Sequence, residues 1–169
     1  MINAELIILL EEYENKNSID HIIAYFYRLS KPRKYQLPIY AYGTIQFPPT
    51  YQSLMEDYHI IDQMQNLYIS RTLWHFIISF DLPVNDENLY HHFADGIARL
   101  FMAAYPVCYT YHADTGHFHV HFCVLATGYR LGSPPLDKNR FRIYLSALQE
   151  YAHKNFQITL HTRWKNANT

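Results

Sequence analysis

The chain has 169 residues, 49% of them hydrophobic and 17% aromatic, which excludes a disordered polypeptide and fits a single domain with a buried core. Its two cysteines, Cys108 and Cys123, exclude a disulfide framework, and no apolar run approaches the roughly 20 residues of a membrane span. A formal net charge of −1 counts against a uniformly basic nucleic-acid binder, although local basic stretches can still meet phosphates.

The sequence predicts a single domain that spans residues 1–169. Within residues 1–17 it predicts an extra N-terminal helix, formed by residues 4–13. The apolar run at 6–10 has no basic residues before it and no small-residue cleavage site after it, so it is not a signal peptide. We therefore expect a cytoplasmic protein whose thiols are reduced.

A second helix is predicted from Ser18, because apolar residues then recur with helical spacing at Ile19, Ile22, Ile23, Phe26 and Leu29. It must end by Lys31, since the proline that follows disfavours a helical residue before it. Residues 35–47 predict irregular chain or a short strand, and residues 50–66 predict a further helix.

The segment RTLWHFIISFD, residues 71–81, is apolar at both alternating sets of positions and predicts a strand inside a sheet. Asn85 or Asp86 then begins a helix whose inner face is predicted to consist of Leu89, Phe93, Ile97, Leu100 and Phe101. Two strands joined by a short turn (107–112 and 117–125), a last helix (139–155) and an edge strand (158–161) follow. This order predicts an α+β fold, with one antiparallel sheet and helices packed on one of its faces.

The segment HADTGHFHVHF, residues 112–122, holds four of the chain's eleven histidines. Side chains alternate between the two faces of a strand, so His117, His119 and His121 share one face while the apolar residues between them anchor the other. Imidazoles at positions i and i+2 lie roughly 7 Å apart and can converge on one ion from a rigid backbone. The pattern therefore predicts a metal site on the histidine face.

The third ligand depends on the length of the turn between the two strands. With a four-residue loop, His112 lies opposite His117 and joins the face of His119 and His121; with a three-residue loop it turns to the core, and His117 replaces it. Three neutral imidazoles leave coordination positions open for a substrate, as metal-assisted phosphodiester chemistry requires. A closed structural zinc site that uses Cys123, on the same face, is the alternative.

The histidine segment resembles the third motif of plasmid-mobilisation relaxases, written H-x-D-x-x-H-x-H-x-H. Upstream, TLWHFIISFDLP is similar to that family's strand ending in Ser-Phe, and DENLYHHFADGIARLFMAAYP to the helix after it. AYFYRLSK is similar to the family's Tyr-x5-Lys segment and contains Tyr25 and Lys31, while DKNRFRIYLSALQEYAHKNF resembles the helix that follows the histidine strand. Leu125 stands where the family usually has asparagine.

This resemblance implies a His-hydrophobic-His (HUH) endonuclease whose nicking domain cuts single-stranded DNA at a transfer origin and forms a covalent 5′-phosphotyrosine. It implies Tyr25 as the nucleophile and His112, His119 and His121 as metal ligands, with Asp114 near them. The implied cofactor is Mn²⁺ or Mg²⁺, with Zn²⁺ or Ni²⁺ as ions that a purified sample can carry. The implied partners are the DNA strand and the accessory and coupling proteins of a relaxosome.

Further roles follow from position in the predicted elements. Asp81 shares strand parity with His75 and Ser79, and we expect it to orient a ligand histidine or to accept the tyrosine's proton. The DNA strand is expected to meet the basic residues after the tyrosine and two polar residues of the hairpin, namely Arg28, Lys31, Arg33, Lys34, His117 and Asp114.

Other interpretations remain open on the sequence. Tyr25 lies at one edge of its helix's apolar stripe, and Tyr27 at the opposite edge is its near rival. A rolling-circle initiator or transposase would instead use Tyr151 of YAHK, a Tyr-x-x-Lys segment on a helix after the histidines. A relaxase-like DNA-binding or accessory protein without catalysis, and a structural zinc protein, are the remaining alternatives.

Overall fold

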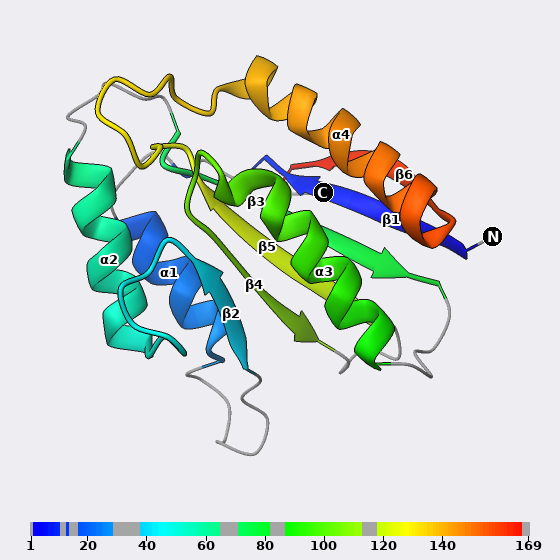
Figure 1. Ribbon diagram of the computed structural model, residues 1–169, viewed down its shortest axis with the longest axis horizontal. Helices are drawn as coiled ribbons and strands as arrows, with labels where there is room; N and C mark the ends of the chain where they lie inside the picture. Colours follow the sequence, from blue (N-terminus) through cyan, green and yellow to red (C-terminus); the bar gives the residue numbers. More distant parts are fainter. Residues whose placement is uncertain are drawn as a thin grey trace.

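Helices and strands alternate along most of the chain. The structure is a computed structural model that describes residues 2–10, 13, 17–28, 38–64, 71–81, 87–112 and 118–166. The elements in chain order are β1 Ile2–Leu9, α1 Asn17–Phe26, β2 Ile39–Tyr42, α2 Tyr51–Met64, β3 Leu73–Phe80, α3 Glu87–Met102, β4 Val107–His112, β5 His119–Leu125, α4 Lys138–Phe156 and β6 Ile158–Lys165 (Figure 1).

The strands form one six-stranded sheet in the order β2-β4-β5-β3-β1-β6. Neighbouring strands are antiparallel except β1 and β6, which run parallel. β3 lies between β5 and β1 and buries side chains on both of its faces, as its continuous apolar sequence predicts. The predicted α+β class is therefore confirmed, and the predicted antiparallel sheet is antiparallel except for the β1–β6 pair.

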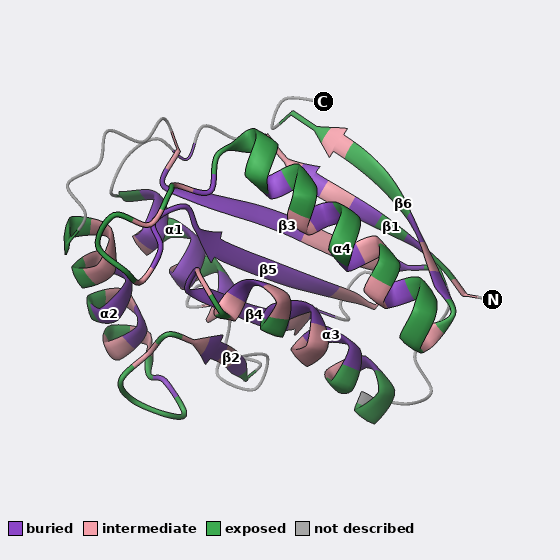
Figure 2. Ribbon diagram, turned by 45° about the horizontal axis from the view of Figure 1, so that its top comes forward, coloured by how far each residue is buried: buried purple, intermediate pink, exposed green. Residues whose placement is uncertain are grey.

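One face of the sheet carries the larger core and packs against α3 and α4, which lie in front of the strands in Figure 2. It is built from alternate residues of each strand, such as Phe76 on β3 and Phe122 on β5, whose ring centroids lie 4.8 Å apart in a stacked arrangement. Phe101 of α3 and Phe141 of α4 lie within 5.9 Å of the Phe76 ring. Offset and edge-on aromatic contacts of this kind add to the free energy gained from burying apolar surface.

The opposite face carries a smaller core beneath α1 and α2. Ile19, Ile23 and Phe26 of α1 are fully buried there, together with Leu73 and Leu125 of the sheet. The predicted placement of helices on one face thus describes α3 and α4, while α1 and α2 cover part of the second face. The reason is that the second face is also apolar at one end and needs a cover of its own.

The helix predicted over residues 4–13 is wrong, because residues 2–9 form the strand β1. Ala4, Leu6 and Ile8 are buried at a spacing of two and join the larger core. The short run LIILL fits the helical and the strand period alike. Hydrogen bonding on both edges, antiparallel to β3 and parallel to β6, settles the strand.

The remaining elements agree with the sequence to within a few residues, with two differences. The last strand, β6, extends to Lys165, four residues beyond the prediction. Leu89 is 38% exposed, and its neighbour Tyr90 is buried instead, with its ring 4.6 Å from that of Phe80. Within the described residues, no helix is both long and apolar enough to cross a bilayer.

Candidate metal centre

Three histidines meet at the end of the β4–β5 hairpin, on the face that α1 partly covers. His112 ends β4 and pairs directly with His119, the first residue of β5, and His121 follows two residues later on the same face. One ligand nitrogen from each histidine can be chosen so that all three lie within 4.8 Å of one another. The three side chains therefore form a possible metal site.

The strand register differs from the predicted one by two residues. His112 pairs with His119 rather than with His117, so the connection between the strands is longer than four residues. A shift of two keeps the parity of every side chain, and His112 consequently lies on the predicted face. His117 and Asp114, the other candidates in this segment, lie outside the described residues.

The burial of the cluster fits a metal-binding role. His112 and His121 are each only 2% exposed, while His119 is half-buried. Within the part of the chain that the structure describes, Nε2 of His121 has no hydrogen-bond partner, and a buried polar atom in that state costs free energy. Burial, followed by the nearby His75 and His112, holds the pKa of His121 far below its ordinary value. The imidazole is therefore neutral, which is the form that binds a metal.

A fourth histidine, which the sequence did not single out as functional, lies directly behind His121. His75 Nε2 lies 3.1 Å from His121 Nδ1, and His75 Nδ1 lies 3.1 Å from the hydroxyl of Tyr13. Burial, and then His112, lowers the pKa of His75 to about 3. Its strand parity with Ser79 was visible in the sequence, but its contact with His121 depends on how β3 pairs with β5, which the sequence alone does not give.

Tyr25 lies over the histidine cluster. Its ring centroid is 5.4 Å from that of His121 and 5.5 Å from that of His112, both nearly edge-on, and the side chain is 49% exposed. Helix α1 ends just after Tyr25, where Arg28 adopts a left-handed backbone (φ 49°) and donates its N–H to the Tyr25 carbonyl. The end of the helix thus places a half-exposed phenol beside buried imidazoles.

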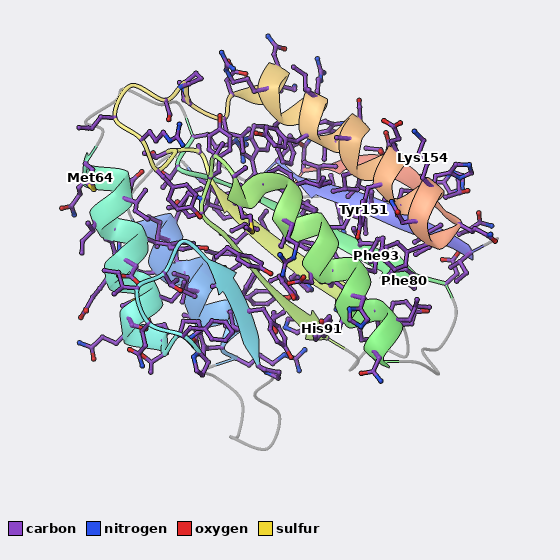
Figure 3. All side chains as sticks on the ribbon, viewed as in Figure 1. Met64, Phe80, His91, Phe93, Tyr151 and Lys154 are labelled. Atoms are coloured by element: carbon purple, nitrogen blue, oxygen red, sulfur yellow. The ribbon has the colours of Figure 1, made fainter. Side chains whose placement is uncertain are left out.

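The two rival tyrosines have other surroundings. The Tyr27 hydroxyl donates to the carbonyl of Pro49 at 2.8 Å, and burial raises the pKa of Tyr27 to about 12. Tyr151 lies on α4 (Figure 3), on the opposite side of the sheet from the clustered histidines. Its hydroxyl fills the space over Gly96 of α3. A Cβ on Gly96 would lie 1.8 Å from that hydroxyl, so Tyr151 acts as a packing residue between the two helices.

The remaining predicted site residues are placed only in part. Asp81 is exposed just past the end of β3, two residues beyond Ser79, which pairs with His119. The side chain within hydrogen-bonding distance of His121 is that of His75, and the role predicted for Asp81 stays a prediction. Arg28 is near enough that its charge contributes to lowering the pKa of His121. Lys31, Arg33 and Lys34 lie outside the described residues.

The two cysteines are not members of the three-histidine group, although Cys123 pairs with His75. The thiols of Cys108 and Cys123 face each other across β4 and β5 and are fully buried. Among the described residues the potential ligand group contains three histidines and no cysteine, which counts against a closed zinc site.

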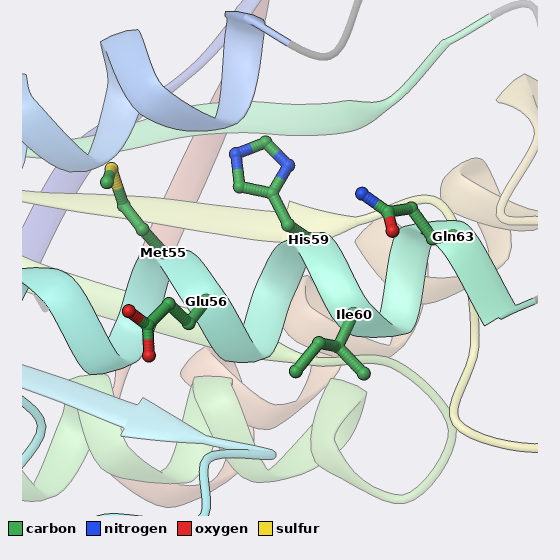
Figure 4. A pocket seen from close by; sticks show the side chains of 5 residues that line it. All are labelled: Met55, Glu56, His59, Ile60 and Gln63. Carbon is green, nitrogen blue, oxygen red and sulfur yellow. The ribbon is translucent and has the colours of Figure 1, made fainter.

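A shallow surface pocket of about 540 Å³ lies along α2, lined by Met55, Glu56, His59, Ile60 and Gln63 (Figure 4).

Comparison with known families points to nucleases. The model of the relaxase family, described as the MobA/VirD2-like nuclease domain, matches residues 29–155, well over half of the chain. The matched segment contains all three clustered histidines and begins after α1, so it does not include Tyr25. No curated protein and no solved structure shows significant similarity to the chain.

Proposed function

Because the chain belongs to the relaxase family of MobA/VirD2-like nuclease domains, we propose that it nicks single-stranded DNA at a transfer origin and becomes covalently attached to the cut strand through Tyr25. Family membership implies DNA binding. The observation that carries the proposal is the position of Tyr25, whose half-exposed ring lies against the rings of His112 and His121. A nucleophile and a metal site must be adjacent if one phosphodiester is to meet both.

The proposed reaction is a transesterification. The Tyr25 oxygen attacks the phosphorus and loses its proton to a base, the bond between phosphorus and the 3′-oxygen breaks, and that oxygen takes up a proton and leaves as a free 3′-hydroxyl. The product is a 5′-phosphotyrosine, which conserves the phosphodiester bond for later resealing. Asp81 remains the predicted base or orienting group, since it lies exposed just past the end of β3, two residues beyond Ser79, which pairs with His119.

The three imidazoles are the proposed metal ligands. They fit a divalent cation because the ligand atoms of His112, His119 and His121 approach within 4.8 Å of one another and because His121 is held neutral. A bound cation supplies positive charge beside the phosphate and polarises its non-bridging oxygens. Imidazole nitrogen favours transition metals over Mg²⁺, so we propose Mn²⁺ before Mg²⁺, with Zn²⁺ or Ni²⁺ as competitors in a purified sample.

The DNA strand is proposed to enter past the end of α1. Arg28 lies there, and the predicted DNA contacts Lys31, Arg33 and Lys34 follow it in the sequence. Phosphate contacts from Lys and Arg supply most of the affinity of a protein for a nucleic-acid backbone. With a formal net charge of −1 the chain has no general surplus of positive charge, and we propose that relaxosome accessory and coupling proteins assist it at the origin.

The test is a denaturing-gel assay for a covalent adduct. The purified protein, with Mn²⁺, is mixed with single-stranded oligonucleotides tiled across the candidate transfer origins of the DNA element that encodes it. We expect the wild type to form an adduct that survives denaturant and Tyr25→Phe to form none. Tyr27→Phe is the matched control, because it removes a hydroxyl two residues away that is bonded to Pro49, and it should retain the adduct.

The same assay separates the alternatives. Loss of the adduct in Tyr151→Phe, with Tyr25→Phe active, would assign the chain to the rolling-circle initiator or transposase class. Folded wild type that binds metal and single-stranded DNA at every candidate origin yet forms no adduct would make it a DNA-binding accessory protein without catalysis.

A further inference from the structure

A chain of hydrogen bonds extends from His121 away from the cluster. His121 Nδ1 lies 3.1 Å from His75 Nε2, and His75 Nδ1 lies 3.1 Å from the Tyr13 hydroxyl. All three side chains are less than a tenth exposed. They come from the segment after β1, from β3 and from β5, so the chain of bonds forms only in the assembled sheet.

The two hydrogen bonds that join His121, His75 and Tyr13 can run in either of two donor-to-acceptor directions, because a neutral imidazole has one N–H and one nitrogen lone pair. In the first, His121 Nδ1 donates to His75 Nε2, and His75 Nδ1 donates to the Tyr13 oxygen. In the second, Tyr13 donates to His75 Nδ1, His75 Nε2 donates to His121 Nδ1, and His121 Nε2 carries a proton. Only the first direction leaves the Nε2 lone pair of His121 available to a metal.

We propose that His75 is a positioning residue that holds His121 in the ring orientation and tautomer required for metal binding, and that Tyr13 holds His75 in turn. This inference rests on the proposed metal-binding role of the three clustered histidines. Ligand histidines usually donate their second N–H to a carboxylate, a backbone carbonyl or a water molecule. A neutral imidazole accepts more weakly than a carboxylate and adds no negative charge, so more of the cation's charge remains for the phosphate.

The packing around His75 leaves it little freedom to move. Its ring centroid lies 5.7 Å from that of Phe26 and 6.2 Å from that of Tyr25. The Tyr13 carbonyl accepts a hydrogen bond from the backbone N–H of Thr72 at 2.5 Å, which ties Tyr13 to the start of β3. His75 contacts both the proposed ligand His121 and the proposed nucleophile Tyr25. A substitution of His75 therefore removes a supporting contact without replacing either of those two side chains.

The first test measures Co²⁺ affinity, with Co²⁺ as a spectroscopic probe, in the full chain and four variants. We expect His75→Leu to weaken binding about 10–100-fold, the range seen when the outer partner of a ligand histidine is removed. His75→Gln, whose amide oxygen can accept the same hydrogen bond, should recover most of the affinity, and Tyr13→Phe should lose less than His75→Leu. His91→Leu is the matched control, since His91 Nδ1 also bonds a tyrosine hydroxyl, that of Tyr111, at 2.6 Å, but on α3.

A second readout needs no substitution and covers the case in which His75→Leu fails to fold. Long-range ¹H–¹⁵N spectra of the Zn²⁺-loaded wild type should show His75 protonated at Nδ1 and not at Nε2. The opposite tautomer of His75 would overturn the inference, and so would a folded His75→Leu variant that binds Co²⁺ as tightly as the wild type.

The failures of the two proposals are distinguishable with one more variant, His119→Ala. If the wild type binds Co²⁺, His119→Ala does not, and His75→Leu binds normally, the inference about His75 fails alone. If the wild type does not bind, or His119→Ala binds equally well, the proposed metal site fails and the inference fails with it.

Discussion

The two faces of β5 are opposite in character although their residues alternate along one strand. Val120, Phe122 and Val124 belong to the larger core under α3 and α4, whereas His119 and His121 point to the side of α1. The first face buries apolar side chains, each of which stabilises the fold by roughly 1.5–3 kcal/mol. The second buries the imidazole of His121, whose pKa burial lowers so far that the ring is neutral. The apolar face thus stabilises the sheet, and the stable sheet keeps the histidines on the other face in fixed positions.

The second face is itself divided along the strands. At one end Cys123 and Leu125 are buried in the smaller core with Tyr58 of α2, and at the other end the histidines begin. Phe26 marks the boundary, since it belongs to that core and its ring centroid lies 6.1 Å from that of His121. The last turn of α1 therefore closes the apolar part and presents Tyr25 to the polar part.

The largest expected effect comes from the apolar face. Phe122→Ala removes the ring that stacks on Phe76, and we expect the free energy of unfolding to fall by about 3–5 kcal/mol because a large buried side chain leaves a cavity. Urea denaturation of the metal-free protein measures it, with Phe122→Leu as a milder control that keeps part of the volume. A loss below about 1 kcal/mol, the average for any substitution, would refute the assignment of stability to this face.

On the histidine face, we expect a substitution to leave the stability of the metal-free protein almost unchanged and to remove the stabilisation by bound metal. His119 is half-buried, so His119→Ala should change the stability of the metal-free protein by no more than about 0.5 kcal/mol. A saturating divalent metal should stabilise the wild type by about 2.7 kcal/mol at roughly 100 times its Kd, and this gain should vanish in the variant. Thermal or urea unfolding of the wild type and of His119→Ala, each with Mn²⁺ and with EDTA, measures this gain. An equal gain in both proteins would show that His119 does not bind the metal.

Acid should weaken the polar face selectively. The pKa of His75 is about 3 in the folded protein, against an ordinary value of 6.5. Between these two pH values the unfolded protein binds a proton at His75 and the folded protein does not. Stability from this group is complete above pH 6.5 and is lost as the pH falls toward 3, by about 1.4 kcal/mol per pH unit. The loss for His75 alone is therefore about 2 kcal/mol at pH 5.

Urea denaturation of the metal-free protein from pH 7 to pH 5 measures this slope. His75→Gln removes this titrating group and should flatten the slope. Equal slopes in the wild type and His75→Gln would show that folding does not lower the pKa of His75.

The sequence was sufficient where one local pattern determined the outcome. The helical spacing of Ile19, Ile22 and Phe26 gave α1, and the alternation after His117 gave the histidine face, because parity survives a register shift of two. It was insufficient where the outcome depended on a distant partner. The run at 6–10 became a strand through pairing with β3 and β6, and the contact of His75 with His121 required the β3–β5 register.

The smallest expected effect tests whether the two faces are independent. Asp137 caps α4 by accepting a hydrogen bond from the backbone N–H of Arg140 at 2.8 Å, and Asp137→Ala should cost about 1 kcal/mol of unfolding free energy. Asp137→Asn is the control, because asparagine caps about as well. Since α4 packs on the apolar face through residues such as Phe141, the affinity for Co²⁺ should be the same in all three proteins. A weaker affinity in Asp137→Ala would mean that destabilising the apolar face also weakens metal binding on the histidine face. The two faces would then be separate in position but coupled in free energy.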